Sequence, residues 1–311
     1  MKPRKQTQHG KKQVSPKSEA TPEQSPERLQ KIMATAGLGS RRALERQIKS
    51  GEVRVNNEVA SIGQNAGIGD KIKLDNREWT VVGTGTQSPH RNLVYNKPTG
   101  EVTTRSDPQG RPTVFDRLPV IEGSRWIAVG RLDINTSGLL LMTTDGELAH
   151  AMMHPSNKVD REYACRIFGE VDADQLNKLR TGVMLDDGMA QFSDIQPAGG
   201  EEGNRWYHVT LLEGRNREVR RLWASQGATV SRLKRVRYGA VFLPKRLRMG
   251  DWAELTDKDH QIIREDVKLG PVPVQLALKA EKVQRESDQR AIRKKMGPRK
   301  KSTRYKNVDR K

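Results

Sequence analysis

The sequence has little of several features that would indicate particular classes of protein. It contains a single cysteine, Cys165, which excludes a disulfide within the chain and a cysteine-cluster zinc site. None of its apolar runs approaches the 18 residues that a membrane-spanning helix needs. The first residues also lack the apolar core of a secretory signal, so we expect a protein of the reducing cytoplasm.

Apolar and aromatic residues are scarce, at 34% and 5% of the 311 residues, and the mean hydropathy is −0.80. The shortage is concentrated at the two ends. Residues 1–27 and 271–311 have few apolar side chains and together carry 13 of the 19 net positive charges. We therefore predict disordered basic tails at residues 1–26 and 270–311, and a normal buried core between them.

The excess of positive charge predicts a polyanionic partner. The sequence pI of about 10.1 suits a nucleic acid or the surface of an anionic membrane. The six histidines are scattered, and His150 and His154, four residues apart, lack the glutamate of a metalloprotease pair. Because the sequence carries no cofactor motif either, we expect neither a metal nor a cofactor.

The basic C-terminal segment allows two interpretations. Residues 276–296 have some helical propensity but only a thin apolar stripe. They either solvate the protein or form an arm that orders on contact with RNA. The fourteen Lys and Arg residues within 271–311, with Tyr305 as the lone aromatic, favour the RNA-binding arm.

A small helix–helix–sheet domain is predicted at residues 27–88. The segment Ser25–Glu27 is typical of a helix start, and Gly37 of a helix end. Ser40 can cap a second helix that Gly51 terminates, and short strands follow. A glycine- and threonine-rich linker then leads to a second domain.

The first domain carries a group of cations that admits a functional interpretation. They could form a solvated helix face, but Arg41 and Arg42 lie at a predicted helix N-terminus, where cations and backbone donors together suit a phosphate. The segment resembles the small RNA-binding domain first described in a ribosomal protein, at residues 39–43, 51–56 and 69–70. We therefore predict RNA contacts from Arg28, Lys31, Arg41, Arg42, Arg46, Lys49 and Arg54.

Residues 89–269 are predicted to form an α+β domain with a mixed, mostly antiparallel sheet flanked by helices. Strands and helices follow one another without the regular repeat of a doubly wound fold. The predicted strands are residues 92–96, 126–129, 139–142, 162–168, 206–212 and 232–238, and the predicted helices are residues 147–153, 172–180, 217–225 and 257–264.

The most informative stretch is GRLDINTSGLLL at residues 130–141, where Asp133 lies in a polar turn between two apolar runs. Strands on both sides would hold this carboxylate in place. Asp133 could simply cap its own turn. The spacing also resembles the start of a calcium-binding loop, but Thr144 stands where that loop needs a glutamate. The third interpretation is a catalytic carboxylate, with Arg131 on the same side of an extended chain.

Two further segments carry candidate residues. Tyr163 stands at the start of a strand, either as a surface aromatic or as a ring that stacks on a nucleobase. Residues 212–222 combine a strand, a glycine turn and a basic helix start in which Val219 faces inward. Arg220 is drawn toward the core, where an arginine needs a carboxylate partner. The remaining arginines either form a solvated face or bind RNA, and we predict RNA contacts from Arg215, Arg217 and Arg221.

The order of four motifs resembles that of the pseudouridine synthases that act on ribosomal RNA, and the resemblance spans residues 27–256. The surroundings of Arg131 and Asn216 and the basic tail look most like the branch that acts on the large ribosomal subunit. The four motifs are NKPTG at residues 96–100, which alone would be an ordinary turn, GRLDINTSGLLL at 130–141, the Arg-x-Tyr strand at 161–163, and EGRNREVRRL at 213–222.

The resemblance implies an isomerase that flips one uridine out of the RNA and re-forms its glycosidic link through carbon. Asp133 is then the catalytic residue, and the sequence leaves open whether it attacks the sugar, attacks the uracil ring or removes a sugar proton. The family further implies that Arg220 forms an ion pair with this aspartate and that Tyr163 stacks on the base. It also implies that Val219 packs beneath the base and that Arg131 holds the site open.

We expect a monomer that acts on large-subunit ribosomal RNA or on ribosome assembly intermediates, without a membrane or a cofactor. The single candidate carboxylate agrees with covalent catalysis by one nucleophile. The rival hypothesis is an RNA-binding factor that keeps the fold and lacks the activity. The intact set of Asp133, Tyr163 and Arg220 favours the enzyme.

Overall fold

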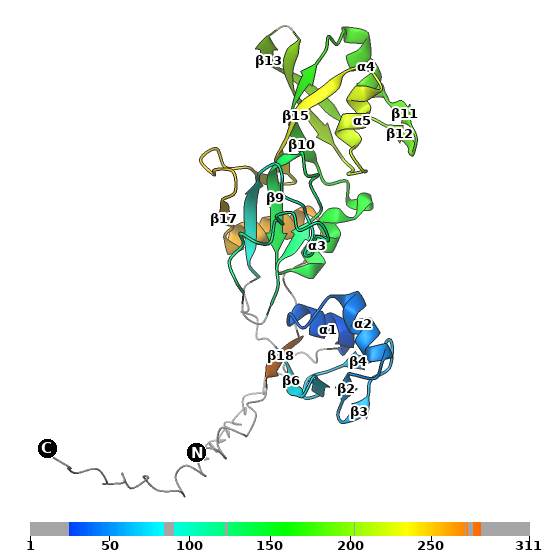
Figure 1. The fold of residues 1–311 in the computed structure, drawn as a ribbon, viewed down its shortest axis with the longest axis vertical. Coiled ribbons are helices and arrows are strands. Elements are labelled where there is room, and N and C mark those ends of the chain that lie inside the picture. The colour runs from blue at the N-terminus through cyan, green and yellow to red at the C-terminus, as the bar shows by residue number, and fades with distance from the viewer. Residues whose placement is uncertain are drawn as a thin grey trace, which may run out of the picture.

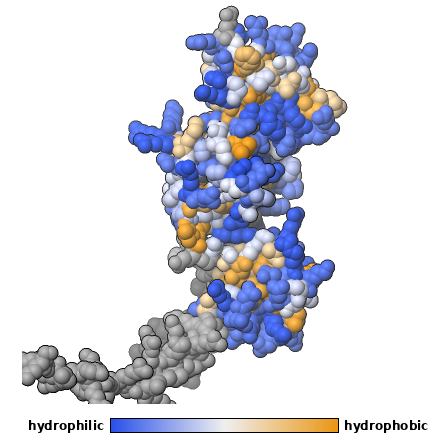
Figure 2. Space-filling model, viewed as in Figure 1, coloured by the Kyte–Doolittle hydropathy of each residue, from blue (hydrophilic) through white to orange (hydrophobic). Residues whose placement is uncertain are grey.

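The computed structural model of the protein describes residues 25–83, 90–121, 124–201, 203–270, 272 and 276–280. Residues 1–24 and 281–311, which make up most of the predicted tails, lie outside the described residues. The chain folds into two units that follow one another along the long axis of Figure 1, each with its own buried core. The face drawn in Figure 2 is mainly hydrophilic, and no helix of the described segments is long and apolar enough to cross a membrane.

The first unit packs two short helices against a small sheet. Ser40 caps the second helix as predicted, because its Oγ accepts a hydrogen bond from the backbone N–H of Ala43 at 3.1 Å. Leu44 of this helix and Leu29 of the first are both fully buried in the core of the unit. The elements are β1 (Glu27–Arg28), α1 (Leu29–Thr35), α2 (Arg41–Lys49), β2 (Arg54–Val55), β3 (Glu58–Val59), β4 (Asn65–Ala66), β5 (Lys71–Leu74) and β6 (Arg77–Gly83).

The first helix begins later than the sequence predicted. Helix α1 starts at Leu29 and not in the segment Ser25–Glu27, because Glu27 and Arg28 pair as β1 with β4. The backbone of Arg28 is accordingly extended, with ψ at 126°. A strand pairing with residues almost forty positions away therefore overrides the local helix signal.

The far end of the chain completes the sheet of the first unit. Strand β18 (Leu276–Ala280) pairs antiparallel with β6, and the strand order becomes β18-β6-β5-β2-β3. Leu276 is buried in the core of this unit, and Leu278 packs against it. The prediction of a disordered tail over residues 270–311 is therefore wrong for residues 276–280, which form a strand whose alternate leucines cover an apolar surface. The chain consequently passes between the two units twice.

The second unit is built on a nine-stranded sheet with the order β13-β14-β10-β15-β9-β7-β17, to which β16 and β8 add at β15 and β9. The separate hairpin β11–β12 and the strands β13, β16 and β17 are additions to the predicted strands. The strands are β7 (Asn92–Lys97), β8 (Ile127–Val129), β9 (Ser137–Thr143), β10 (Arg161–Phe168), β11 (Val183–Leu185), β12 (Gly188–Ala190), β13 (Asp194–Glu201), β14 (Asn204–Leu211), β15 (Thr229–Tyr238), β16 (Val241–Phe242) and β17 (Trp252–Glu254), and the helices are α3 (Gly146–Met153), α4 (Ala173–Thr181), α5 (Glu218–Ala224) and α6 (Asp257–Asp266), with a short 3-10 helix at Pro155–Asn157.

The mixed sheet confirms the predicted α+β class. Strands β9 and β15 run parallel, and the other pairs in this sheet are antiparallel. Leu139 and Leu141 of β9 face one apolar core, while Leu140 and Met142 face another on the opposite side. Because both faces of β9 are covered, its sequence is a continuous apolar run. The loop at residues 130–136 thus leads directly into one of the most deeply buried strands.

Candidate active site

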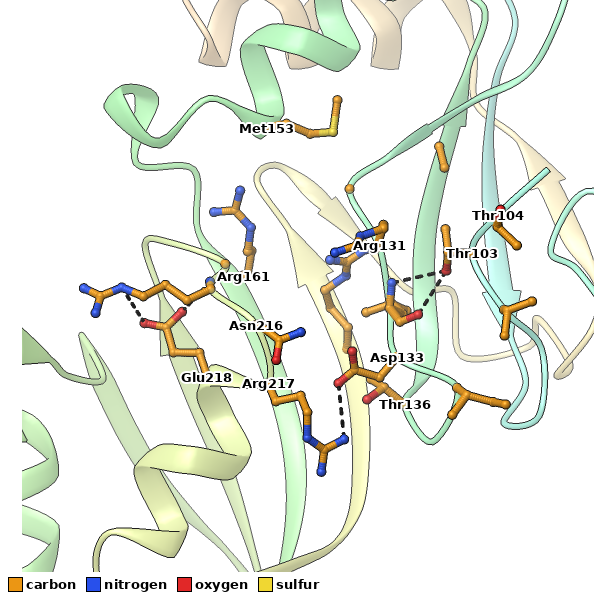
Figure 3. Close-up of a pocket in the computed structure, with 18 of the residues that line it drawn as sticks. Thr103, Thr104, Arg131, Asp133, Thr136, Met153, Arg161, Asn216, Arg217 and Glu218 are labelled. Atoms are coloured by element: carbon orange, nitrogen blue, oxygen red, sulfur yellow. Dashed lines mark hydrogen bonds and ion pairs between the residues drawn. The ribbon is translucent and has the colours of Figure 1, made fainter. Parts of the chain in front are cut away.

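Asp133 lies in the loop between β8 and β9, at the wall of a cavity of about 1030 Å³. The turn is tight, since the backbone N–H of Thr136 donates to the carbonyl of Asp133 at 3.0 Å. The carboxylate remains accessible, with 35% of the side chain exposed. Figure 3 shows the loop on one side of the cavity and the start of α5 on the other.

Lys97 anchors this loop from beneath. The side chain is fully buried, and its Nζ donates to the carbonyl oxygens of Pro98 at 2.9 Å, Asp133 at 3.1 Å and Thr136 at 2.9 Å. Burial lowers the pKa of this ammonium group to about 8. Three carbonyl acceptors replace the water that the ammonium group lost, and they connect the end of β7 to both ends of the turn that contains Asp133.

The segment after Lys97 holds the outer side of the same loop. The backbone N–H of Gly100 donates to the carbonyl of Ile134 at 2.8 Å. The hydroxyl of Thr103 donates to the carbonyl of Leu132 at 3.0 Å and accepts from the N–H of Leu132 at 3.3 Å. The NKPTG motif is therefore more than a turn, because it and the residues after it fix the backbone on either side of the aspartate.

Gly138, near the start of β9, is a position of the GRLDINTSGLLL motif that requires glycine. Its φ is +99°, and a Cβ atom at this position would lie 2.2 Å from the carbonyl oxygen of Arg235. This is the place where β9 meets β15 in parallel register. The side chain of Arg235 is buried as well, and its Nε donates to the carbonyl of Leu139 at 2.7 Å. The absence of a side chain at Gly138 thus permits the close pairing that supports the loop.

The cationic partner of Asp133 differs from the predicted one. Arg217 Nη1 lies 3.9 Å from Asp133 Oδ2, and Figure 3 shows the two side chains pointing toward one another. Arg220, the partner predicted from the family, instead donates to the carbonyls of Val230 at 2.7 Å and Asn135 at 3.0 Å. The guanidinium group of Arg220 therefore binds the backbone two residues after the aspartate, and no ion pair joins it to the carboxylate of Asp133 within the described residues.

Arg217 reaches the carboxylate because of its position at the start of α5. It is the N-cap residue, with the left-handed φ of +47° that side chains rarely adopt. Its side chain is 49% exposed and leans over the cavity. Strain at a residue that contacts the candidate catalytic group is typical of functional sites.

The other predicted support residues line the same cavity. Tyr163 on β10 and Val219 on α5 are largely buried, whereas Arg131 is exposed. The cavity also contains two buried arginines, one from the Arg-x-Tyr motif and one, Arg235, that the sequence analysis did not single out. Arg161 and Arg235 stack on the ring of Tyr238 with their guanidinium carbons 4.8 Å and 4.7 Å from its centroid. The cavity wall is therefore aromatic, apolar and positively charged.

Arg215 and Arg221 are engaged within the protein. Arg221 binds the carboxylate of Asp187 through two bonds of 2.8 Å, and Arg215 donates to the carboxylate of Glu213 at 2.8 Å and 2.9 Å. Both arginines were predicted to contact RNA. In the structure their ion pairs instead stabilise the β11–β12 hairpin and the turn before α5.

Glu218 was missed by the sequence analysis. Only 2% of its side chain is exposed, and Oε2 accepts from the backbone N–H of Arg215 at 2.9 Å. Burial raises the pKa of this carboxyl group to about 7, and the neighbouring Glu213 adds to the effect. Glu218 thus closes the turn that presents Arg217 to the cavity.

The predicted cations of the first unit differ in their surroundings. Lys31 pairs with Glu27 at 2.9 Å, Arg54 donates to the carbonyl of Asn57 at 2.9 Å, and Arg28 donates to the carbonyl of Gly63. The remaining four side chains are exposed and have no ion-pair partner among the described residues. They are Arg41, Arg42, Arg46 and Lys49.

Lys97 had a detectable signal in the sequence. It ends the run Asn92–Lys97, in which every residue is buried, and a lysine at an inward position of such a strand is unusual. Thr103 and Arg235 offered no comparable local signal, because their partners lie in other segments, such as Leu139 on β9 for Arg235. Glu218 has its partner only three residues away, at Arg215, but its burial depends on the packing of the whole turn.

Known proteins resemble this chain in both units. The model of the RNA pseudouridylate synthase family matches residues 91–225, and that of the S4 domain matches residues 27–72. A Pseudomonas aeruginosa protein named ribosomal large subunit pseudouridine synthase B is 56% identical, over 79% of this chain and 64% of that protein. A protein of the same name from Xylella fastidiosa is 55% identical, over 78% of this chain and 52% of that protein. Another from Escherichia coli is also 55% identical, over 79% of this chain and 84% of that protein. The chain therefore spans about half to two-thirds of the length of the first two relatives.

The fold agrees with these likenesses. A solved structure described as a pseudouridylate synthase superposes with a TM-score of 0.53 at 25% identity, covering 76% of this chain and 99% of that one. The predicted family resemblance and the predicted architecture, an S4 domain followed by a mixed-sheet synthase domain, are thereby confirmed. The chain belongs to the RNA pseudouridylate synthase family.

Proposed function

We propose that the protein is an isomerase that converts one uridine of large-subunit ribosomal RNA into pseudouridine. The observation that carries the proposal is the accessible carboxylate of Asp133, which lies at the wall of a positively charged cavity in a loop pinned from several sides. The likeness to proteins named ribosomal large subunit pseudouridine synthase B supports the choice of substrate. The RNA-binding domain corresponds to residues 27–88 together with β18, and the catalytic domain to residues 89–269.

The reaction breaks the bond between C1′ of the ribose and N1 of uracil and forms a bond between C1′ and C5. The C5 hydrogen leaves as a proton once the new bond has formed, and N1 takes up a proton in place of its lost bond. The step is therefore an isomerisation that needs no oxidant or phosphate donor. Asp133 supplies the nucleophilic carboxylate that keeps the two fragments in the site while uracil turns. Because the glycosidic bond of a stacked base is out of reach, the uridine has to leave the RNA stack first.

The residues around Asp133 have distinct proposed roles. Tyr163 offers a ring on which the uracil stacks, and Val219 supplies an apolar surface beneath it. Arg131 stands at the exposed part of the cavity, where it can fill the space that the flipped base left in the RNA. Arg217 orients the carboxylate, and Arg220 keeps the turn closed from behind through the carbonyl of Asn135. We propose that the protein acts as a monomer in the cytoplasm. Its substrate is either naked ribosomal RNA or the RNA of an assembling subunit.

The proposal is tested by mapping pseudouridine in ribosomal RNA from a strain that lacks the gene and carries a plasmid copy. The wild type and Asp251→Asn, a substitution of an exposed acid in the same unit, should restore the modification. Asp133→Asn should not restore it, because an amide is a poor nucleophile. If the Asp133→Asn protein restores the modification, Asp133 has no part in the reaction. If the wild type changes no position, the rival hypothesis of an RNA-binding factor gains support.

A further inference from the structure

A group of arginines lies where the two units meet. Arg125 belongs to the second unit, but its Nη1 donates to the carbonyl of Gly39 in the first unit at 3.0 Å. Beside it, a Cβ atom on Gly37 would lie 3.3 Å from the carbonyl oxygen of Ser124. The turn between α1 and α2 is therefore in direct contact with the segment that leads into β8.

Two further arginines extend this group in opposite directions. Arg105 donates to the carbonyl of Trp126, next to Arg125, and its guanidinium carbon lies 4.5 Å from the centre of the Phe115 ring. Arg105 also lines the cavity that contains Asp133. On the other side, Arg41 is the exposed first residue of α2, two positions after Gly39. The three guanidinium groups thus connect the RNA-binding domain with the cavity.

The charges of these arginines are uncompensated within the described part of the chain. No described carboxylate lies within ion-pair distance of Arg41, Arg105 or Arg125, and the buried Nε of Arg125 has no hydrogen-bond partner there. Burial lowers the pKa of Arg125, and the charges of Arg105 and Arg41 lower it further. Like charges gathered without an acid raise the free energy of the unbound protein, and a bound polyanion relieves that cost.

We propose that Arg41, Arg105 and Arg125, the junction arginines, bind phosphodiesters of the RNA strand that runs from the S4 domain to the flipped uridine. This inference rests on the proposed function, because it assigns the RNA a path across the junction. Guanidinium groups bind phosphate oxygens through paired hydrogen bonds, and such contacts set the register of the RNA without reading its sequence. The competing explanation is a latch between the units that makes no contact with RNA.

Filter binding of a large-subunit ribosomal RNA transcript between 50 and 200 mM salt distinguishes the two explanations. The double variant Arg41→Ala/Arg105→Gln leaves the Arg125–Gly39 bond between the units in place. Each lost phosphate contact lowers the slope of log Kd against log salt by about 0.7–0.9. The affinity deficit of the double variant should therefore be about 7–12-fold larger at 50 mM than at 200 mM salt.

Matched variants separate a charge effect from a structural one. Arg77→Ala and Arg232→Ala remove exposed arginines from the first and second units and should keep the wild-type slope. In the background of Arg41→Ala, Arg105→Lys should regain most of the slope that Arg105→Gln loses, because a lysine keeps the charge. A double variant with the wild-type slope, control variants with the same deficit, or a lysine variant no better than the glutamine variant would each overturn the inference.

The binding slope is independent of turnover, so it also separates failure of this inference from failure of the proposed function. Tritium release from a transcript labelled at C5 of uridine measures turnover in the same samples, because C5 loses its hydrogen when the new bond forms. A wild type that binds with a steep slope but releases no tritium contradicts the proposed function and leaves the junction arginines supported. If the wild type releases tritium but the double variant keeps the wild-type slope, the proposed function is supported and the inference about the junction arginines is contradicted.

Discussion

Replacement of Lys97 by methionine tests whether a buried cation holds the turn that contains Asp133 in place. Methionine keeps most of the apolar stem of lysine but removes the three hydrogen bonds from Nζ. The carbonyl of Asp133 keeps its second bond, from the N–H of Thr136 at 3.0 Å. The carbonyls of Pro98 and Thr136 lose a bond from a charged donor, which is stronger than a bond from a neutral one.

The size of the effect follows from these contacts. A buried acceptor that loses its partner costs about 1–3 kcal/mol, so two acceptors predict a loss of about 2–6 kcal/mol. Methionine avoids the cost of burying an ammonium group, which places the expected loss in the lower half of that range, at about 3 kcal/mol. A domain with a typical stability of about 5–15 kcal/mol still folds after such a change.

Activity should suffer more than folding. A displacement of the catalytic group by about 1 Å can reduce the rate about 100-fold, and the turn with Asp133 loses its central anchor. We expect kcat to fall by about that factor while KM stays close to the wild-type value, because the RNA contacts remain. Thr103→Val removes a smaller clamp on the neighbouring residue Leu132, at 3.0 Å, and should cost about 1 kcal/mol.

Urea unfolding and tritium release from a ribosomal RNA transcript measure the two effects. Lys245→Met, a substitution of an exposed lysine in the same unit, is the matched control and should change neither quantity. The reasoning is refuted if Lys97→Met unfolds at the wild-type urea concentration and also turns over at the wild-type rate. A loss of stability without a loss of kcat would limit Lys97 to a role in folding.

Three further predictions address other parts of the structure. Because burial raises the pKa of Glu218 to about 7 from its ordinary value of 4.5, the folded protein retains a proton that the unfolded chain releases. The free energy of unfolding of the wild type should therefore fall by about 3 kcal/mol relative to that of Glu218→Gln as the pH rises from 4.5 to 7. Urea unfolding at several pH values measures this difference. A chain that ends at Leu269 lacks β18 and should lose about 2–4 kcal/mol of stability in the first unit, whereas a chain that ends at Ala280 keeps it; limited proteolysis would show equal protection if β18 contributes nothing. Gly138→Ala places a methyl group 2.2 Å from the carbonyl of Arg235 and should cost more than about 4 kcal/mol, seen as a lower melting temperature; an unchanged melting temperature would contradict the close strand pairing.

Several elements followed from signals contained within a few residues. Ser40 and Gly51 bound a helix at residues 41–49 as predicted, because caps act on the turn next to them. The apolar run Leu139–Met142 predicted a strand, and burial on both faces explains why it does not alternate. The position of Asp133 between two strands could also be predicted from the sequence, because both flanking apolar runs have the composition of strands.

Other features depended on residues far apart in the chain. The local helix signal before Leu29 yielded to pairing with β4, and residues 276–280 became a strand because β6 had an open edge and a core to cover. The family resemblance placed Arg220 beside Asp133. The structure gives the ion pair to Arg217, because the left-handed residue at the start of α5 points its side chain into the cavity.

The sequence by itself predicted the class of the fold, a polyanionic partner and the aspartate around which we propose that the site is built. Composition, capping residues and apolar periodicity are local properties, and they need no knowledge of distant segments. The tertiary structure alone decided what holds that aspartate and what surrounds it. Lys97 meets the carbonyl of Thr136 across 39 positions of sequence, and Arg125 meets that of Gly39 across 86. Such contacts form only once strands and domains have packed, because hydrogen bonds and charges act over a few ångströms of space and not along the chain.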